Sequence, residues 1–171
     1  ITYSYTNSFG CSGQDTTTMN VLSAPVITFT TISPLCNHSG AITLNNASPA
    51  GGVYSGTGVT GNSFDPEVSG AGTFDITYDY MNSSGCFSSA TTQITVNPNP
   101  VVSFASFGTA CINGGAFALT GGSPAGGVYS GPGVTNNMFD PSTLGPGSYT
   151  ITYTYTSSAG CSSSTAQSLN V

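Results

Sequence analysis

The residues of this sequence with the clearest chemistry are its five cysteines. Cys11, Cys86 and Cys161 follow one another at intervals of 75 positions, and Cys36 and Cys111 are separated by the same interval. Thiols at a fixed spacing serve as disulfide partners or as metal ligands. Each complete 75-residue period contains one pair of cysteines 50 positions apart. We therefore predict the disulfides Cys36–Cys86 and Cys111–Cys161, with Cys11 unpaired or paired outside this segment.

A metal site is the competing interpretation of the cysteines. Structural zinc sites place two ligands a few residues apart, as in Cys-x-x-Cys, and the sequence has no such pair. The single histidine, His38, corresponds to Asn113 one period later, so it does not recur as a ligand would. We predict no metal and no cofactor, and we place His38 in a surface loop.

The six acidic residues are the next candidates for catalysis. Asp65 and Asp140 recur within Phe-Asp-Pro, where an aspartate caps a turn ahead of proline. Glu67 could join Asp65 in a calcium site, but Ser142 stands at its equivalent position. Asp75 and Asp79 likewise have no acidic counterparts. Because acid–base catalysis needs placed carboxylates or an activated nucleophile, we expect no catalytic residue and no enzyme.

The charge balance excludes several classes of partner. The chain has no lysine and no arginine, and its formal net charge is −6. Proteins that bind nucleic acid, phosphate groups or acidic membrane surfaces need clustered basic side chains. The apolar runs are far shorter than the roughly 20 residues that cross a bilayer. We therefore expect no nucleic-acid partner and no membrane insertion.

The 75-residue interval between cysteines belongs to a repeat that runs through the whole chain. Residues 25–96 and 100–171 align without a gap and are identical at 35 of 72 positions. This predicts complete modules at 25–99 and 100–171. Residues 1–24 match only the last third of a module, so we expect them to be completed either by a longer tandem array, which we favour, or by strands from another polypeptide.

Within a module the apolar residues alternate with polar ones, as they do in half-buried strands. The clearest case is Ile-Thr-Tyr-Thr-Tyr-Thr at 151–156, and Gly- and Pro-rich turns separate it from shorter runs at 101–104, 115–120 and 127–130. The many short strands in each repeat predict an all-β fold of tandem immunoglobulin-like β-sandwich modules with one disulfide per module. Disulfides in turn predict an oxidising compartment, so we expect a secreted or surface-displayed protein.

The tyrosines could bind sugars by stacking, but their spacing favours the core. In the alternating run the Ile and Tyr side chains share one face, and the threonines share the other. Tyr54 and Tyr129, which lie in glycine-flanked segments, leave a glycan-binding surface open. Asn-x-Ser sequons at Asn37, Asn46 and Asn82 are candidates for glycosylation.

The near absence of charge is itself informative about partners. Charged residues, lysine above all, normally protect sheet edges from pairing with other chains. Apart from His38, no acid or base occurs at positions 16–64 or 80–139. Neutral, Thr- and Ser-rich modules can pack against copies of themselves with little repulsion. We therefore expect copies of the same protein as the main partner.

The repeat also resembles a known family. The segment Ser-Pro-Ala-Gly-Gly-Val-Tyr-Ser-Gly-Pro-Gly-Val at 123–134, followed by Phe-Asp-Pro at 139–141 and Gly-Cys at 160–161, resembles the tandem immunoglobulin-like repeats of very large surface proteins in Bacteroidota. The resemblance implies export to the cell surface by the type IX route and a role as stalk, adhesin or fibre. It does not imply catalysis.

Three functions follow from these expectations. The favoured one is a non-enzymatic extracellular structural protein that forms a cell-surface filament. The second is an adhesin whose modules bind glycans or a host surface, and the third is a passive spacer of a larger exported enzyme.

Overall fold

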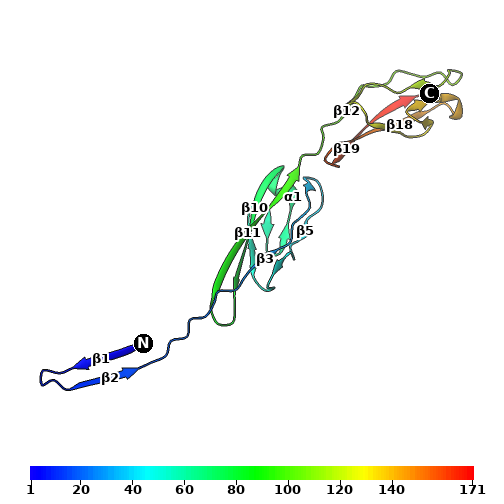
Figure 1. Ribbon diagram of the computed structural model, residues 1–171. Coiled ribbons are helices and arrows are strands. Elements are labelled where there is room, and N and C mark those ends of the chain that lie inside the picture. Colours follow the sequence, from blue (N-terminus) through cyan, green and yellow to red (C-terminus); the bar gives the residue numbers. More distant parts are fainter.

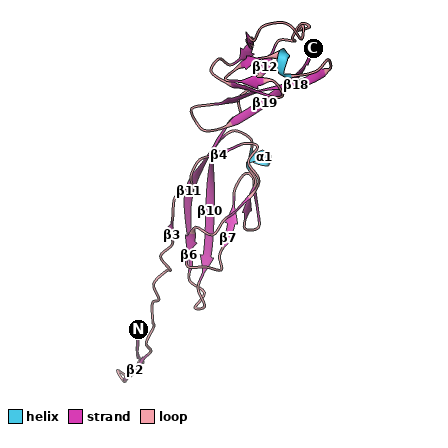
Figure 2. Ribbon diagram, turned by 90° about the vertical axis from the view of Figure 1, so that its right-hand side faces the viewer, coloured by secondary structure: helices cyan, strands magenta, loops and turns pink.

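The computed structural model describes residues 1–171, and its regular structure is almost all β, with 46% of the residues in strands and 4% in helices, which confirms the all-β prediction. Three parts follow one another along an elongated molecule (Figures 1 and 2). A hairpin forms the N-terminal part, and the two repeat modules follow it. Each module has a hydrophobic core of its own.

The N-terminal hairpin stands apart from both modules. Its strands β1 (Thr2–Thr6) and β2 (Ser12–Thr16) pair only with each other, and every residue in them is exposed. An extended segment then leads to the first module, as Figure 1 shows. Neither face of this two-stranded hairpin is therefore covered by a hydrophobic core.

The first module contains a four-stranded sheet of order β4-β11-β10-β7 and two smaller sheets, β3-β6 and β5-β9-β8. Its elements are β3 (Thr28–Phe29), β4 (Leu35–Cys36), β5 (Ile42–Thr43), β6 (Ala47–Ser48), β7 (Val53–Ser55), β8 (Val59–Thr60), β9 (Ser63–Phe64), α1 (Pro66–Ser69), β10 (Gly72–Met81) and β11 (Phe87–Asn97).

The second module repeats this plan with three sheets, β15-β18-β19, β12-β14 and β13-β17-β16. Its elements are β12 (Ser103–Phe104), β13 (Phe117–Ala118), β14 (Gly122–Ser123), β15 (Val128–Ser130), β16 (Val134–Thr135), β17 (Met138–Phe139), the 3-10 turn η1 (Pro141–Thr143), β18 (Ser148–Thr156) and β19 (Ser162–Asn170).

A long hairpin forms the main sheet of each module, β10 with β11 and β18 with β19. The alternation of apolar and polar residues explains which side chains of these hairpins are buried. Ile151 and Tyr153 are buried in β18, and the threonines between and after them are only partly covered. The prediction that the Ile and Tyr side chains of this run build the core is confirmed for this pair and for its counterpart, Ile76 and Tyr78.

The two short helical turns begin at the Phe-Asp-Pro motifs. The Asp65 carboxylate accepts a hydrogen bond from the backbone N–H of Glu67 at the start of α1, with an N···O distance of 2.9 Å. Asp140 does the same for Ser142 at η1, with a distance of 3.0 Å. Both aspartates cap turns, as predicted. Neither of these turns is long or apolar enough to be a membrane-spanning helix.

A buried tyrosine hydroxyl fastens the glycine-rich loop of each module to its core. The Tyr153 hydroxyl accepts a hydrogen bond from the Gly127 N–H at 2.8 Å and donates one to the Pro124 carbonyl. Tyr78 makes the equivalent pair with Gly52 and Pro49 in the first module. The loop backbone therefore lies directly against the ring.

We predict that Gly127→Ala lowers the free energy of unfolding by about 2 kcal/mol, because an added methyl group in a closely packed site forces its neighbours to shift. A Cβ at this position would clash with Cζ of Tyr153 and would lie 2.6 Å from the Thr154 carbonyl oxygen. Urea unfolding monitored by far-UV circular dichroism measures the loss. Gly115→Ala is the matched control, because nothing lies within 4 Å of its Cβ position. Equal stability of the two variants would contradict the close packing of this loop.

Candidate functional site: the junction between the modules

The structure contains one disulfide, and it joins the two modules rather than closing either one. Cys36 of the first module is bonded to Cys161 of the second, with 5.6 Å between their Cα atoms. Cys86, Cys111 and Cys11 remain thiols. The predicted pairs Cys36–Cys86 and Cys111–Cys161 are therefore wrong, and so is the expectation of one disulfide within each module.

The length of the main hairpin explains why the predicted pairing fails. Cys36 lies beside Asn97, at the end of β11, whereas Cys86 immediately precedes the first residue of that strand. A strand of this length, at about 3.3 Å per residue, separates the two cysteines by about 33 Å. Disulfides require Cα atoms within about 7 Å of each other. The two cysteines of one module thus lie at opposite ends of it.

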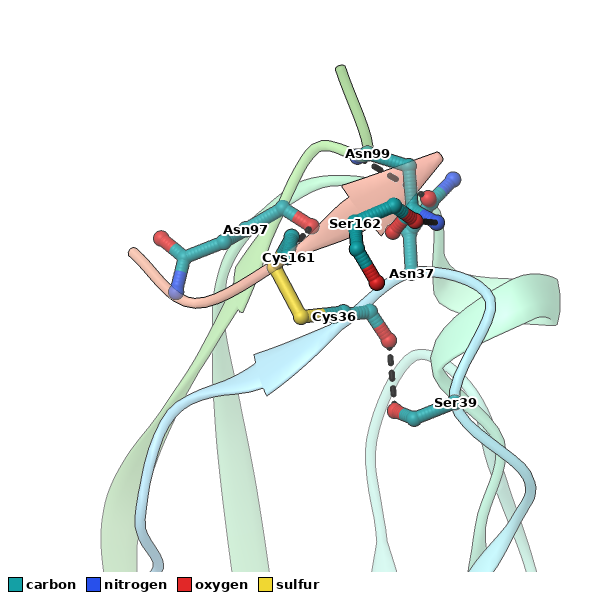
Figure 3. Close-up of a disulfide and its surroundings, with 7 residues drawn as sticks. All are labelled: Cys36, Asn37, Ser39, Asn97, Asn99, Cys161 and Ser162. Carbon is teal, nitrogen blue, oxygen red and sulfur yellow. Dashed lines mark hydrogen bonds between the residues drawn. A yellow bond between two sulfur atoms is a disulfide. The ribbon is translucent and has the colours of Figure 1, made fainter. Parts of the chain in front are cut away.

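Cys36 is held in a tight turn at the C-terminal end of the first module (Figure 3). Its carbonyl oxygen accepts hydrogen bonds from the hydroxyl of Ser39 at 2.6 Å and from the N–H of Ser39 at 2.9 Å. The N–H of Asn37 donates to the carbonyl of Asn97 at 3.0 Å, which extends the parallel pairing of β4 with β11. These bonds fix the cysteine against the strand that leads out of the module.

The partner cysteine comes from the tip of the next long hairpin. Cys161 immediately precedes β19, and its side chain is completely buried. Its Sγ lies 4.0 Å from the carbonyl oxygen of Asn97. The hairpin tip of the second module therefore packs against the last residues of the first.

The linker between the modules takes part in the same contact. The Nδ2 of Asn99 donates to the carbonyl of Ser162 at 3.2 Å, and its backbone N–H lies 3.4 Å from Oδ1 of Asn37. Figure 3 shows these groups around the disulfide. The turn, the linker and the hairpin tip thus meet at one point.

The residues of the junction support a structural role. They are asparagines, serines and cysteines, so none of the side chains shown in Figure 3 carries a charge. The contacts are hydrogen bonds and one covalent bond, which are weakly sensitive to salt. Burial of Cys161 also shields one sulfur from reductants in solution. The arrangement can fasten two modules in a fixed orientation.

The other residues singled out in the sequence lie away from this junction or inside the cores. Tyr54 and Tyr129 are buried, so their rings are not available to stack on sugars. His38 lies in the turn that follows Cys36, which agrees with the predicted loop. The Oδ1 of Asp65 accepts a hydrogen bond from the Glu67 N–H and so caps the turn of α1.

The three sequons differ in how far their amides are engaged. Nδ2 of Asn46 donates to the carbonyl of Thr30 at 2.8 Å. Oδ1 of Asn82 accepts from the N–H groups of Ser84 and Cys86 and so organises the hairpin tip. Oδ1 of Asn37 faces Asn99 at the junction. All three are only partly exposed, and glycosylation at them stays a prediction.

Sequence reasoning missed the roles of Asn97, Asn99 and Ser162. Asn97 and Asn99 flank a proline in the connector Asn-Pro-Asn-Pro, a composition typical of an extended spacer. An asparagine that bonds across a junction has the same residue type as one exposed in a linker. No signal in the sequence therefore distinguishes them.

No protein-family model matches the chain, and no curated protein matches it either. The junction and the repeat are therefore the features from which a function can be inferred.

Proposed function

We propose that this chain is a non-enzymatic extracellular structural protein whose immunoglobulin-like modules are the building units of a cell-surface filament. The observation that carries the proposal is the covalent junction: a linker, a set of hydrogen bonds and a disulfide all join the same two modules. A flexible string of domains needs only the linker. Three connections at one point suit a protein whose shape must be kept.

The modules are also suited to repeated association. They follow one another in line, and the chain has neither lysine nor arginine to guard its sheet edges. Adjacent copies would meet with little electrostatic repulsion beyond the net charge of −6. A disulfide persists in an oxidising environment outside the cytoplasm, which supports surface display.

The adhesin alternative named Tyr54 and Tyr129 as candidate sugar-binding residues. Both side chains lie in the cores of the modules. A glycan-binding function would therefore need a different surface of the modules. For this reason we favour the structural function over the adhesin.

Electron microscopy of the purified protein tests the proposal. We expect regular fibres with a constant repeat along their length. Because the chain has no lysine or arginine to form ion pairs, the fibres should persist from about 0.05 to about 1 M NaCl. Isolated beaded molecules at every concentration would contradict a filament, and dissolution at high salt would contradict its uncharged contacts.

A further inference from the structure

The three hairpin-tip cysteines occupy the same local structure. In each tip the N–H at position −4 from the cysteine donates to the cysteine carbonyl: Asn7 to Cys11 at 3.0 Å, Asn82 to Cys86 at 3.0 Å and Ser157 to Cys161 at 2.8 Å. The N–H of the glycine before each cysteine donates to the carbonyl of the residue at position −4, with N···O distances of 2.9 or 3.0 Å. Cys86 and Cys11 therefore have the same local backbone structure as Cys161. Cys161 forms a disulfide, whereas the other two are thiols.

The two turn cysteines are equivalent in the same way. The N–H of Gly114 donates to the carbonyl of Cys111 at 2.8 Å, as that of Ser39 does to Cys36. The segment before Cys111 also runs parallel to the last strand of its module, with Thr109 opposite Asn170. In the first module Leu35 lies opposite Val96, and these two residues are the same number of positions apart as Thr109 and Asn170. Cys111 thus lies at the C-terminal end of the second module, where Cys36 lies in the first.

Neither turn cysteine can reach the hairpin tip of its own module. Cys161 precedes β19, whereas Cys111 follows Ala110, whose N–H donates to the carbonyl of Asn170 at the far end of that strand. At about 3.3 Å per residue, the strand separates the two cysteines by about 30 Å. Any disulfide of the exposed Cys111 thiol must therefore be with a cysteine beyond its own module. The bonded pair of the first junction shows which partner fits.

We infer that the disulfides form a ladder along an array of such modules, in which the turn cysteine of each module bonds to the hairpin-tip cysteine of the next. This inference rests on the proposed structural function. Cys86 is the partner for the turn cysteine of a preceding module, and Cys111 bonds the hairpin tip of a following one. In each bond two thiols lose two protons and two electrons to a disulfide oxidant such as oxidised glutathione, which is reduced to two thiols.

The N-terminal hairpin leaves exposed the residues whose equivalents are core residues in the two modules. Tyr3 is 69% exposed, whereas its equivalents Tyr78 and Tyr153 are each 2% exposed within module cores. Ile1 is exposed as well, although Ile76 and Ile151 are fully buried. In the first module, most of the core residues that pack with Ile76 and Tyr78 come from positions 25–75. A copy of those positions also carries a turn cysteine, which in the ladder would bond Cys86.

The test is to extend the full chain by one repeat. A second copy of residues 25–75, placed directly before Ile1, continues the repeat in register and supplies a new turn cysteine. After refolding with oxidised and reduced glutathione, pepsin digestion at low pH and non-reducing mass spectrometry map the disulfides; the chain has no lysine or arginine for trypsin. We expect the new cysteine bonded to Cys86, with Cys36–Cys161 retained and Cys11 alkylated as a thiol.

Two serine variants of the extended chain make the assignment specific. Cys86→Ser should abolish the new bond, and the matched variant Cys11→Ser should leave it intact. A bond between the new cysteine and Cys11 would overturn the inference, because that pair has the spacing of two cysteines within one module. Quenching of the total tyrosine fluorescence should fall in the extended chain, because Tyr3 and Tyr5, which are exposed in the hairpin, would become covered; this should hold whichever serine variant is used.

A second extension tests the other end independently. A copy of residues 97–171 appended after Val171 supplies a new hairpin tip, whose cysteine should bond Cys111. If Cys86 and Cys111 both stay thiols in their extended chains, the ladder is wrong. Microscopy of the same samples separates the two proposals: fibres without these bonds contradict the ladder alone, and bonds without fibres contradict the filament alone.

Discussion

Replacing both Cys36 and Cys161 by serine is expected to lower the free energy of unfolding by about 5 kcal/mol, the chain-entropy estimate for a loop of this size. The bond joins residues that are 125 positions apart. The loss is a large share of the stability of a protein with two small cores. Urea unfolding followed by tyrosine fluorescence and circular dichroism measures the change.

The same variant should also uncouple the modules. The intact disulfide ties unfolding of one module to the other, so the parent protein is expected to unfold in a narrower transition than the serine variant. Cys11→Ser with Cys111→Ser serves as the control, because both cysteines are exposed thiols. If instead Cys86→Ser with Cys111→Ser removed the stability, the disulfides would lie within modules, and the junction described above would be wrong.

The second large effect is expected from Phe139→Ala, which should cost the second module about 3–5 kcal/mol, because removal of a buried phenylalanine side chain loses its transfer free energy and leaves a cavity. Phe139 is completely buried. Its ring packs against Phe117, with 5.6 Å between ring centroids. Measured in the reduced protein, where the modules are not cross-linked, the loss should appear in one of the two unfolding steps only.

Two further variants show whether each unfolding step belongs to one module. Phe64→Ala should produce a similar loss in the other step, because Phe64 is the equivalent buried residue of the first module. Phe9→Ala should leave both steps unchanged, since its side chain is 90% exposed in the N-terminal hairpin. A loss spread over both steps after Phe139→Ala would show that the two cores are energetically one unit.

The fold could be predicted from the sequence where local pattern decides it. The alternation at 151–156 places Ile151 and Tyr153 in the core of β18, and the Phe-Asp-Pro motif places Asp140 at the start of a turn. Both features depend on neighbours within a few positions. The shorter strands are less well predicted: only Phe117–Ala118 of the run at 115–120 forms a strand, because its pairing with β17 spans just those two residues.

The connectivity of the cysteines could not be predicted in the same way. A strict repeat makes a bond within one module and a bond between neighbouring modules equally compatible with the 75-residue interval. The choice depends on the length of β11 and on the pairing of β4 with its far end, which brings Cys36 beside Asn97. The pairing of these few residues decides which cysteines bond, and no residue type in the sequence predicts that pairing.

The cross-link also changes how the molecule would respond to being pulled. Tension applied to Ile1 and Val171 runs along the backbone to Cys36, crosses the sulfur bridge to Cys161 and continues to the C-terminus. The stretch in between lies outside this path, so its unfolding would add no length to the molecule. Only residues 1–36, which include the hairpin, β3 and β4, and the last strand after Cys161 can be drawn out. A tether built in this way reaches its limit of extension early and afterwards pulls on covalent bonds.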